Sequence, residues 1–448
     1  MSFIADKQTL EDMNLLGKYK QHSIFSLFNK VRTTGGEQLL QQMFQNPLTD
    51  LDVINKRSKI FKHFQGKQTT FPFSNEQFNI MEGYLNGSSS NNYPITLITL
   101  TKKKLLANIV RDEEYAKLQN GLQQTVAVLN HCKIFISQLE EGEKTEQHGQ
   151  YHPFYDELLT VKNILNDPKL EWMTEEQSDA TPYSLQKIAK YDHLLKNVMQ
   201  QALQTVMDTF CQLDVYIAVA NLAKEKNFSY AKAVSRELNQ LRATALRHPK
   251  ISKAVANPVS FSQDSNMIFL TGANMAGKST FMKAFSINLY LAHMGFPVAA
   301  EQMEFSVKDG IYSSINVPDN LDMGLSHFYA EVLRVKKVAE EVSSGKDLVV
   351  IFDELFKGTN VKDAYDATLA VTTAFSQYRN CSFIISTHII EAGEVLKLQS
   401  NIQSLYLPTI MNGNIPTYTY QLEQGISSDR HGMMIIENEG ILEMLEGK

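Results

Sequence analysis

The chain has 448 residues, of which 43% are hydrophobic and 21% are charged. These proportions are ordinary for a soluble globular protein, and the length allows two or three domains with a sizeable core. Lys and Arg number 43 against 49 Asp and Glu, a net charge of −6. This excludes an overall positive field that draws the chain to nucleic acid, so any such contact depends on local basic patches.

Three cysteines are scattered along the chain without a disulfide or metal-binding spacing, namely Cys132, Cys211 and Cys381. Free thiols of this kind fit a reducing compartment. The first residues, Met1–Lys7, lack the basic-then-apolar pattern of a secretory signal, and no apolar run reaches the length of about 18 residues that a membrane helix needs. We therefore expect a cytoplasmic protein with no membrane partner.

Residues 1–98 carry apolar side chains at helical spacing and are predicted to form a helical, core-like domain. The pattern is interrupted at Thr33–Gly36 and again at Asn46–Pro47, which are expected helix boundaries. The segment Gly87–Asn92 is rich in Gly, Ser and Asn and is predicted to be a flexible loop.

Residues 99–238 show longer helical patterns and are predicted to complete that domain with lever-like helices. From Ser184 to about Lys224 the chain has neither Gly nor Pro, which predicts one long helix. The polar segment Glu140–His152 is expected to be an exposed turn. The triplet Lys102–Lys104 either contacts phosphate or begins a solvated helix, and composition leaves both open.

From about residue 239 to residue 448 apolar strands alternate with amphipathic helices. The strands are predicted at Met267–Leu270, Leu348–Phe352 and Ser382–Ser386, with helices at about 325–343 and 363–378. Such alternation is typical of an α/β domain with a mostly parallel sheet and helices on both faces.

The first of these strands leads into a phosphate-binding loop, Gly272–Ser279, of the form G-x-x-x-x-G-K-S. A strand–loop–helix unit directs backbone N–H groups and the positive end of the helix at one point, which suits a polyphosphate. Lys278 is expected to neutralise the β- and γ-phosphates, and the Ser279 hydroxyl to hold Mg²⁺. The predicted nucleotide-binding residues are Gly272, Ala273, Asn274, Met275, Ala276, Gly277, Lys278, Ser279 and Thr280.

Two acidic residues, Asp353 and Glu354, follow the second strand. We expect Asp353 to hold Mg²⁺ through its water shell and Glu354 to polarise an attacking water; without the phosphate-binding loop, an acid that caps a helix would be the plainer reading. His388 follows the third strand and is expected to sense the γ-phosphate or to position the water, the alternative being a structural histidine.

Between these elements, Gly324 and Ser326 precede an amphipathic helix. Ser326 is suited to cap that helix and to offer an anion-friendly surface. Composition alone does not say whose phosphate it meets.

At these positions the chain resembles the MutS family of DNA mismatch repair ATPases. Residues 271–280 resemble that family's T-G-P-N-M-G-G-K-S-T, residues 353–359 its D-E-I-G-R-G-T, residues 386–388 its A-T-H, and residues 324–331 its G-x-S-T-F-x-x-E.

Weaker similarity extends over most of the chain. Residues 425–432 resemble the family's late D-G-x-A-x-x-S-Y-G stretch, and Arg247–Pro249 its R-H-P. Upstream, residues 23–36 and Leu213–Val215 are similar to parts of the family's core domain.

The sequence also departs from the family pattern. It starts at the core domain, without the mismatch-binding domain with its F-x-E wedge and the connector, and it carries His327 where the signature has Thr. It ends soon after Gly432, where the family continues into a dimerising helix-turn-helix, and the interval between the lever helices is short for a full DNA clamp. Mismatch reading is therefore not expected.

The resemblance implies an ABC-like P-loop ATPase domain C-terminal to an all-α core and lever domain. It implies ATP and Mg²⁺ as cofactors, a homodimer formed through the ATPase domains, and contact of Ser326 with the γ-phosphate bound by the other subunit. Tyr420 falls near the family's ring-stacking position. Glu354, His388 and Lys278 would be the catalytic residues.

The motifs, the charge balance and the family resemblance allow three functions to be compared. The first is an ATP-gated homodimer that binds branched or recombination DNA, alone or with a repair or recombination protein, for which Lys102–Lys104, Lys162, Lys187 and Lys190 offer basic residues on the levers. The second is an ATP-dependent scaffold that acts on a protein partner without DNA, which the acidic balance favours. A kinase for a small substrate is disfavoured because no lid or substrate motif is present. Fold analogy does not decide between the first two.

Overall fold

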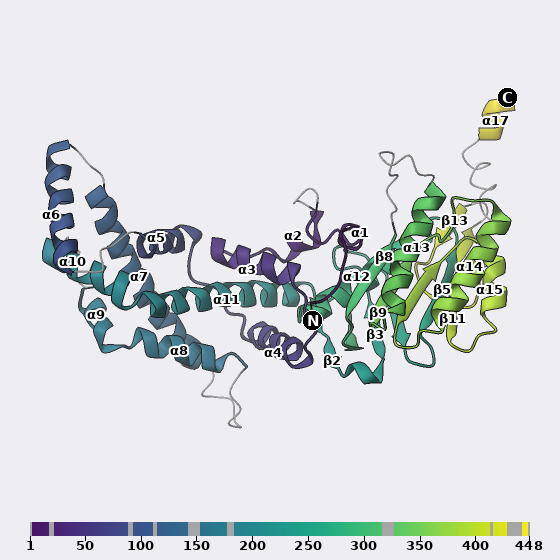
Figure 1. Ribbon diagram of the computed structural model, residues 1–448, viewed down its shortest axis with the longest axis horizontal. Coiled ribbons are helices and arrows are strands. Elements are labelled where there is room, and N and C mark those ends of the chain that lie inside the picture. The colour runs from purple at the N-terminus through teal and green to yellow at the C-terminus, as the bar shows by residue number, and fades with distance from the viewer. Residues whose placement is uncertain are drawn as a thin grey trace. The chain divides into compact units, whose positions relative to one another are not determined.

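The structure is a computed structural model that describes residues 2–17, 22–87, 93–110, 114–141, 153–176, 183–315, 327–412, 415–427 and 441–446 (Figure 1). The chain forms two compact units. Unit 1 comprises Met1–Phe28, Met43–Lys59 and Leu222–Lys448, and unit 2 comprises Asn29–Gln42 and Ile60–Asn221. Each unit combines segments that are far apart in the sequence. The units therefore do not test the predicted domain boundaries at residues 98 and 238, which stay a prediction.

Unit 2 is helical throughout its described residues, as predicted. Its elements, three of which extend into unit 1, are α3 (Thr34–Gln45), α4 (Leu51–Lys67), α5 (Asn75–Leu85), α6 (Tyr93–Val110), α7 (Glu114–Glu141), α8 (Tyr155–Leu165), η2 (Pro168–Leu170), α9 (Trp172–Glu176), α10 (Leu185–His193), η3 (Leu194–Val198) and α11 (Gln200–Glu225). In these described helices no segment is both long and apolar enough to cross a membrane.

The predicted single helix from Ser184 to Lys224 is wrong in one respect, because a π-helical turn, η3, separates α10 from α11. At this turn the ammonium group of Lys196 lies 2.8 Å from the carboxylate of Asp192, and both side chains are buried. The Tyr84 hydroxyl donates to the same carboxylate at 2.9 Å. A π-turn places one extra residue in the helix, which no Gly or Pro announces in the sequence.

A buried carboxylate explains the Gly-rich start of α3. Asp214 on α11 accepts hydrogen bonds from the backbone N–H groups of Arg32 and Thr33 and from the Thr33 hydroxyl, at 2.7 to 3.0 Å. A Cβ atom at Gly36 would lie 2.7 Å from an Asp214 carboxylate oxygen. A larger residue at position 36 would therefore displace this hydrogen-bonded carboxylate.

Unit 1 contains a six-stranded sheet of order β14-β11-β5-β10-β9-β8. The five strands β11, β5, β10, β9 and β8 are parallel to their neighbours, and β14 pairs antiparallel to β11. The predicted mostly parallel sheet is thus confirmed. The strands are β5 (Met267–Gly272), β8 (Gly310–Ser314), β9 (Leu348–Phe352), β10 (Ser382–Ser386), β11 (Ile402–Leu407) and β14 (Glu423–Gln424).

Helices cover this sheet, as the apolar strand runs require. Figure 1 shows α13 (His327–Ser343), α14 (Val361–Ser376) and α15 (Ile390–Leu396) beside the strands of this sheet. These helices share one buried cluster with alternate residues of β5, β9 and β10, such as Phe269, Val350 and Phe383. α12 (Lys278–His293) lies outside that cluster and contacts β5, β8 and a second sheet. The nucleotide loop is therefore held between β5 and α12 in a rigid setting.

The second sheet has the order β2-β7-β3-β4, with β2 (Lys232–Val234), β7 (Gln302–Ser306), β3 (Leu241–Leu246) and β4 (Asn257–Phe261). The remaining elements are α1 (Lys7–Asp12), α2 (Ile24–Phe28), β1 (Ser229–Tyr230), η4 (Arg236–Leu238), β6 (Pro297–Val298), β12 (Thr409–Asn412), β13 (Ile415–Tyr418) and α17 (Ile441–Glu446). Residues 88–92, most of the predicted turn at 140–152, and Gly324 and Ser326 lie outside the described residues.

Candidate nucleotide-binding site

The phosphate-binding loop joins β5, which ends at Gly272, to α12, which begins at Lys278. Its backbone is left-handed at Met275 (φ 67°) and Gly277 (φ 104°). A positive φ is uncommon for a non-glycine residue and marks a backbone held in place by its surroundings. Met275 is 75% exposed, so its side chain lies at the surface and does not pack in the core.

Lys278 turns back over this loop. Its ammonium group donates to the carbonyl oxygens of Gly272 at 2.8 Å and of Ala273 at 3.2 Å. Burial lowers the pKa of Lys278, and the nearby carboxylates of Asp353 and Glu354 oppose that shift. A buried ammonium group at this position is suited to a strongly anionic ligand.

Ser279 and Asp353, which are 74 residues apart, meet at the start of α12. The Ser279 hydroxyl donates to Asp353 Oδ2 at 2.5 Å. Burial raises the pKa of Asp353, and its Oδ1 atom is buried without a hydrogen-bond partner. A hydroxyl oxygen beside a carboxylate oxygen with unused lone pairs is the kind of donor set that Mg²⁺ prefers, so these residues fit the predicted metal.

Glu354 and His388 also meet, from the ends of β9 and β10. His388 Nε2 lies 2.7 Å from Glu354 Oε1, and the Lys357 ammonium group lies 3.0 Å from Glu354 Oε2. The hydrogen bond with His388 is the main cause that lowers the pKa of Glu354 to about 2. The turn is left-handed at Glu354 (φ 51°) and Phe356 (φ 62°), a strain that functional turns often carry.

Beside the loop lies a cavity of about 310 Å³, which is lined in part by Tyr420, the residue that the family resemblance places near the ring-stacking position. Tyr420 closes one side, where a Cβ atom on Gly277 would come within 2.9 Å of the tyrosine ring. Asn257 holds Tyr420 in place, because its amide donates to the Tyr420 carbonyl at 2.9 Å and its oxygen accepts from Leu422 N–H at 2.7 Å. The lining residues are Leu246, Arg247, His248, Ile251, Lys253, Ala254, Val255, Asn257, Gly277, Thr280, Phe281, Ala284 and Tyr420.

His248 gives this cavity a second flat ring. Burial, followed by the charges of Lys250 and Lys283, lowers the pKa of His248 to about 4, so the imidazole is neutral near pH 7. The Lys250 N–H donates to His248 Nδ1 at 3.2 Å, which leaves the ring proton on Nε2. The sequence signal was the Arg247–Pro249 triplet, to which spacing alone assigned no role.

Two of the basic residues proposed for DNA contact are already paired in unit 2. Lys103 lies 2.9 Å from Glu114, and Lys162 lies 2.6 Å from Glu140. Pairing reduces the positive charge that these two lysines present to a phosphate.

A strand, a glycine-containing loop and a helix with Lys278 and Ser279, beside an acidic strand end, define a P-loop nucleotide-binding domain. Residues 268–445 match the family model of MutS domain V, an ABC-type ATPase domain, and residues 8–220 match that of MutS domain III. The chain therefore belongs to the MutS family, with a core domain and an ATPase domain.

One similar relative is the DNA mismatch repair protein MutS of Petrotoga mobilis (strain DSM 10674 / SJ95). It is 25% identical over 263 residues, which are 57% of this chain and 32% of that protein. The match thus spans about a third of the relative's length.

Proposed function

We propose that the protein binds and hydrolyses ATP with Mg²⁺ at this site, and that the nucleotide opens and closes a homodimer that binds DNA. The observation that carries the first part is the meeting of two pairs, Ser279 with Asp353 and Glu354 with His388, beside Lys278. They come from β9, β10 and the start of α12, at the carboxyl edge of a parallel sheet, where ligands bind in open α/β folds.

Each residue has a separate role in this proposal. Lys278 would exchange its two carbonyl partners for the β- and γ-phosphates, because a charged acceptor makes the stronger bond. Ser279 and Asp353 would hold Mg²⁺, which when bound neutralises charge that develops on the phosphates. The loop N–H groups and Gly277 would cradle the phosphates at the start of α12.

Glu354 would orient the attacking water. A carboxylate with a pKa of about 2 is a weak base, but phosphoryl transfer through a loose transition state asks mainly for a positioned water. Each Glu354 oxygen accepts one hydrogen bond, from His388 and from Lys357, and keeps a further lone pair with which it can accept from the attacking water. His388 would then hold the carboxylate or contact the γ-phosphate.

The cavity beside Gly277 would take the adenine base. Its volume of about 310 Å³ and the flat side chains of Tyr420 and His248 are typical of a small-molecule pocket with a few polar groups. Stacking on an aromatic ring is expected to contribute roughly 1–3 kcal/mol to base binding.

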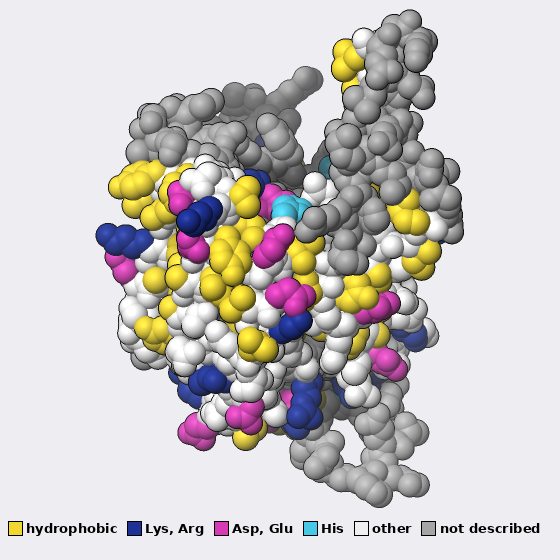
Figure 2. All heavy atoms as spheres, turned by 90° about the vertical axis from the view of Figure 1, so that its right-hand side faces the viewer, with side chains coloured by type: hydrophobic (Ala, Val, Ile, Leu, Met, Phe, Trp, Pro, Cys, Tyr) yellow, Lys and Arg dark blue, Asp and Glu magenta, His cyan; other side chains and the backbone are white. Residues whose placement is uncertain are grey.

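The homodimer and its contact with DNA form the second part of the proposal. Ser326, outside the described residues, would contact the γ-phosphate of the other subunit, so that binding energy drives closure. Figure 2 shows one face of unit 1, on which the described Lys and Arg side chains alternate with Asp and Glu. Any DNA contact is therefore expected on another surface, such as the lysines of unit 2 that the sequence analysis names. The alternative is a scaffold for a protein partner.

The test uses the Glu354→Gln protein, with ATP and Mg²⁺, against labelled homoduplex, mismatched, branched and single-stranded DNA across a salt series. ATP-dependent, salt-sensitive binding to one structure would support the DNA role and identify its substrate. ATP-driven dimerisation without binding to any of these DNAs would favour the protein-partner alternative.

A further inference from the structure

We propose that Asp6 and Asp12, at the start and end of α1, are positioning residues for ATP hydrolysis. Their hydrogen bonds and ion pairs connect β8 to α13. Because β8 and α13 both contact the turn that carries Asp353 and Glu354, these bonds hold that turn in position. The inference rests on the proposed ATPase activity and adds a control point that lies outside the nucleotide site.

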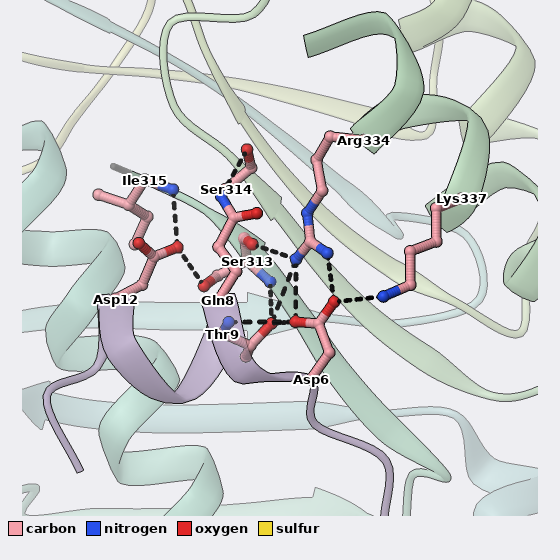
Figure 3. A network of polar contacts seen from close by, with 9 residues as sticks. All are labelled: Asp6, Gln8, Thr9, Asp12, Ser313, Ser314, Ile315, Arg334 and Lys337. Carbon is pink, nitrogen blue, oxygen red and sulfur yellow. Dashed lines mark hydrogen bonds and ion pairs between the residues drawn. The ribbon is translucent and has the colours of Figure 1, made fainter. Parts of the chain in front are cut away.

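Asp6 joins α1 to α13 (Figure 3). Its carboxylate accepts hydrogen bonds from both terminal nitrogens of Arg334, one of them at 3.2 Å, and lies 2.9 Å from the Lys337 ammonium group. The Arg334 guanidinium also donates to the Ser313 carbonyl at 2.5 Å and to the Thr9 hydroxyl at 3.3 Å. One buried arginine therefore connects α1, α13 and β8.

Asp12 joins the other end of α1 to β8. Its Oδ2 atom accepts from the Ser313 hydroxyl at 2.7 Å and from the Ile315 N–H at 2.9 Å, while Thr9 Oγ1 accepts from the Ser313 N–H at 3.0 Å. β8 is the last strand in its sheet. The side chains of α1 thus satisfy backbone donors that a further strand would otherwise take.

Both β8 and α13 contact the catalytic turn. The Asp353 N–H donates to the Ser314 carbonyl at the end of β8, at 3.0 Å. At the start of α13, the Phe328 ring packs against Phe356 with centroids 6.1 Å apart. A displacement of α1 would therefore shift β8 and, with it, Asp353. It would also shift α13 and, with it, Phe356 at the other end of the turn.

The contacts between Asp6 and α13 depend on the negative charge of Asp6 and on the geometry of its hydrogen bonds. Burial alone would raise the pKa of Asp6, but hydrogen bonds from Arg334, Lys337 and Thr9 outweigh it and hold that pKa below its ordinary value. Asp6 is therefore ionised near pH 7. Loss of its charge would leave Arg334, which is 8% exposed, with an uncompensated buried charge.

The test compares Asp6→Asn and Asp12→Asn with the matched control Glu11→Gln. Glu11 lies on the same helix, but its described partner is the exposed Lys7 at 3.8 Å. We expect both test variants to lower kcat by about tenfold or more, equivalent to about 1.4 kcal/mol in the barrier, with the Kd for ATP within about threefold of wild type. The control should retain wild-type values of both.

Two milder variants keep the test decisive if Asp6→Asn does not fold. Lys337→Met removes a partner of Asp6 whose side chain is 53% exposed. Arg334→Lys keeps the positive charge but loses the planar guanidinium that makes two hydrogen bonds to Asp6. Each variant should lower kcat with little change in ATP affinity. Unchanged kcat in these variants would overturn the inference, as would a parallel loss of kcat, ATP affinity and melting temperature. If the wild-type protein does not hydrolyse ATP, both the proposed function and this inference are overturned. If the wild-type protein hydrolyses ATP and kcat is unchanged in the variants, only this inference is overturned.

Discussion

His388 Nε2 and Glu354 Oε1 lie 2.7 Å apart, although the two residues are 34 positions apart in the chain and belong to the ends of different strands. The pairing holds the proposed water-orienting carboxylate in a bonded, ionised state. It also makes the pKa of Glu354 a direct reporter of the site.

His388→Ala should raise the pKa of Glu354 from about 2 toward its ordinary value of 4.5, because His388 is the main cause of the lowering. Lys357→Ala should raise it by less. Since the folded-state pKa is depressed, ionised Glu354 stabilises the fold above about pH 4.5, and this contribution is lost as the pH falls toward 2. Carboxyl-carbon NMR titration measures the shift, and an unchanged pKa in His388→Ala would contradict the geometry.

Glu354→Gln should retain ATP binding and lose turnover by about a hundredfold or more, because the amide keeps the shape but not the charge that orients water. ATP with Mg²⁺ should then accumulate the closed dimer, which size-exclusion chromatography with light scattering detects. Wild-type turnover in this variant would rule out the role given to Glu354.

Lys278→Ala should abolish tight ATP binding, since it removes the buried ammonium group nearest the proposed phosphates. Calorimetry with ATP and Mg²⁺ measures the loss. Lys336→Ala is the matched control, because Lys336 is 69% exposed and pairs with Glu340 on the surface of α13; it should bind like wild type. Equal affinities in the two variants would place the phosphates elsewhere.

Tyr420→Ala should weaken ATP binding by roughly tenfold, in line with the loss of one stacking contact, and leave the affinity for inorganic tripolyphosphate unchanged. Asn257→Leu should act in the same direction, because it removes the hydrogen bonds to the Tyr420 carbonyl and from the Leu422 N–H. Competition against a fluorescent ATP analogue measures both ligands. A matching loss for tripolyphosphate would mean that the ring supports the phosphate loop and not the base.

His293 should make the fold sensitive to acid. Its ring is fully buried, its Nδ1 contacts the Leu48 carbonyl at 2.9 Å, and burial lowers its pKa to about 4. The unfolded chain takes up a proton near pH 6.5 and the folded chain only near pH 4, so stability falls as the pH drops between these values, by on the order of 3 kcal/mol at most. Urea unfolding at several pH values should show a shallower fall in His293→Gln; an identical slope would contradict this.

The class of the domain and the strand–loop–helix unit around Gly272–Ser279 were predictable from the sequence because they depend on local chain geometry. A loop of fixed length between an apolar strand and an amphipathic helix has few conformations, and the acidic strand ends at Asp353 and Glu354 lie at one edge of any parallel sheet that contains them. The parallel sheet and the helical unit followed from periodicity for the same reason.

Tertiary structure decided what depends on residues far apart in the chain. Asn257 binds the Tyr420 carbonyl, 163 positions away in the sequence, and Asp6 binds Arg334, 328 positions away. At such sequence separations no periodic pattern predicts which residues are in contact. The π-turn at Leu194–Val198 likewise coincides with the buried pairing of Lys196 with Asp192, and no helix-breaking residue marks it in the sequence. Local backbone preferences thus specify the Gly272–Ser279 loop. Packing and buried charge determine the cavity beside Gly277 and the contacts of α1, because these exist only once the strands and helices are assembled.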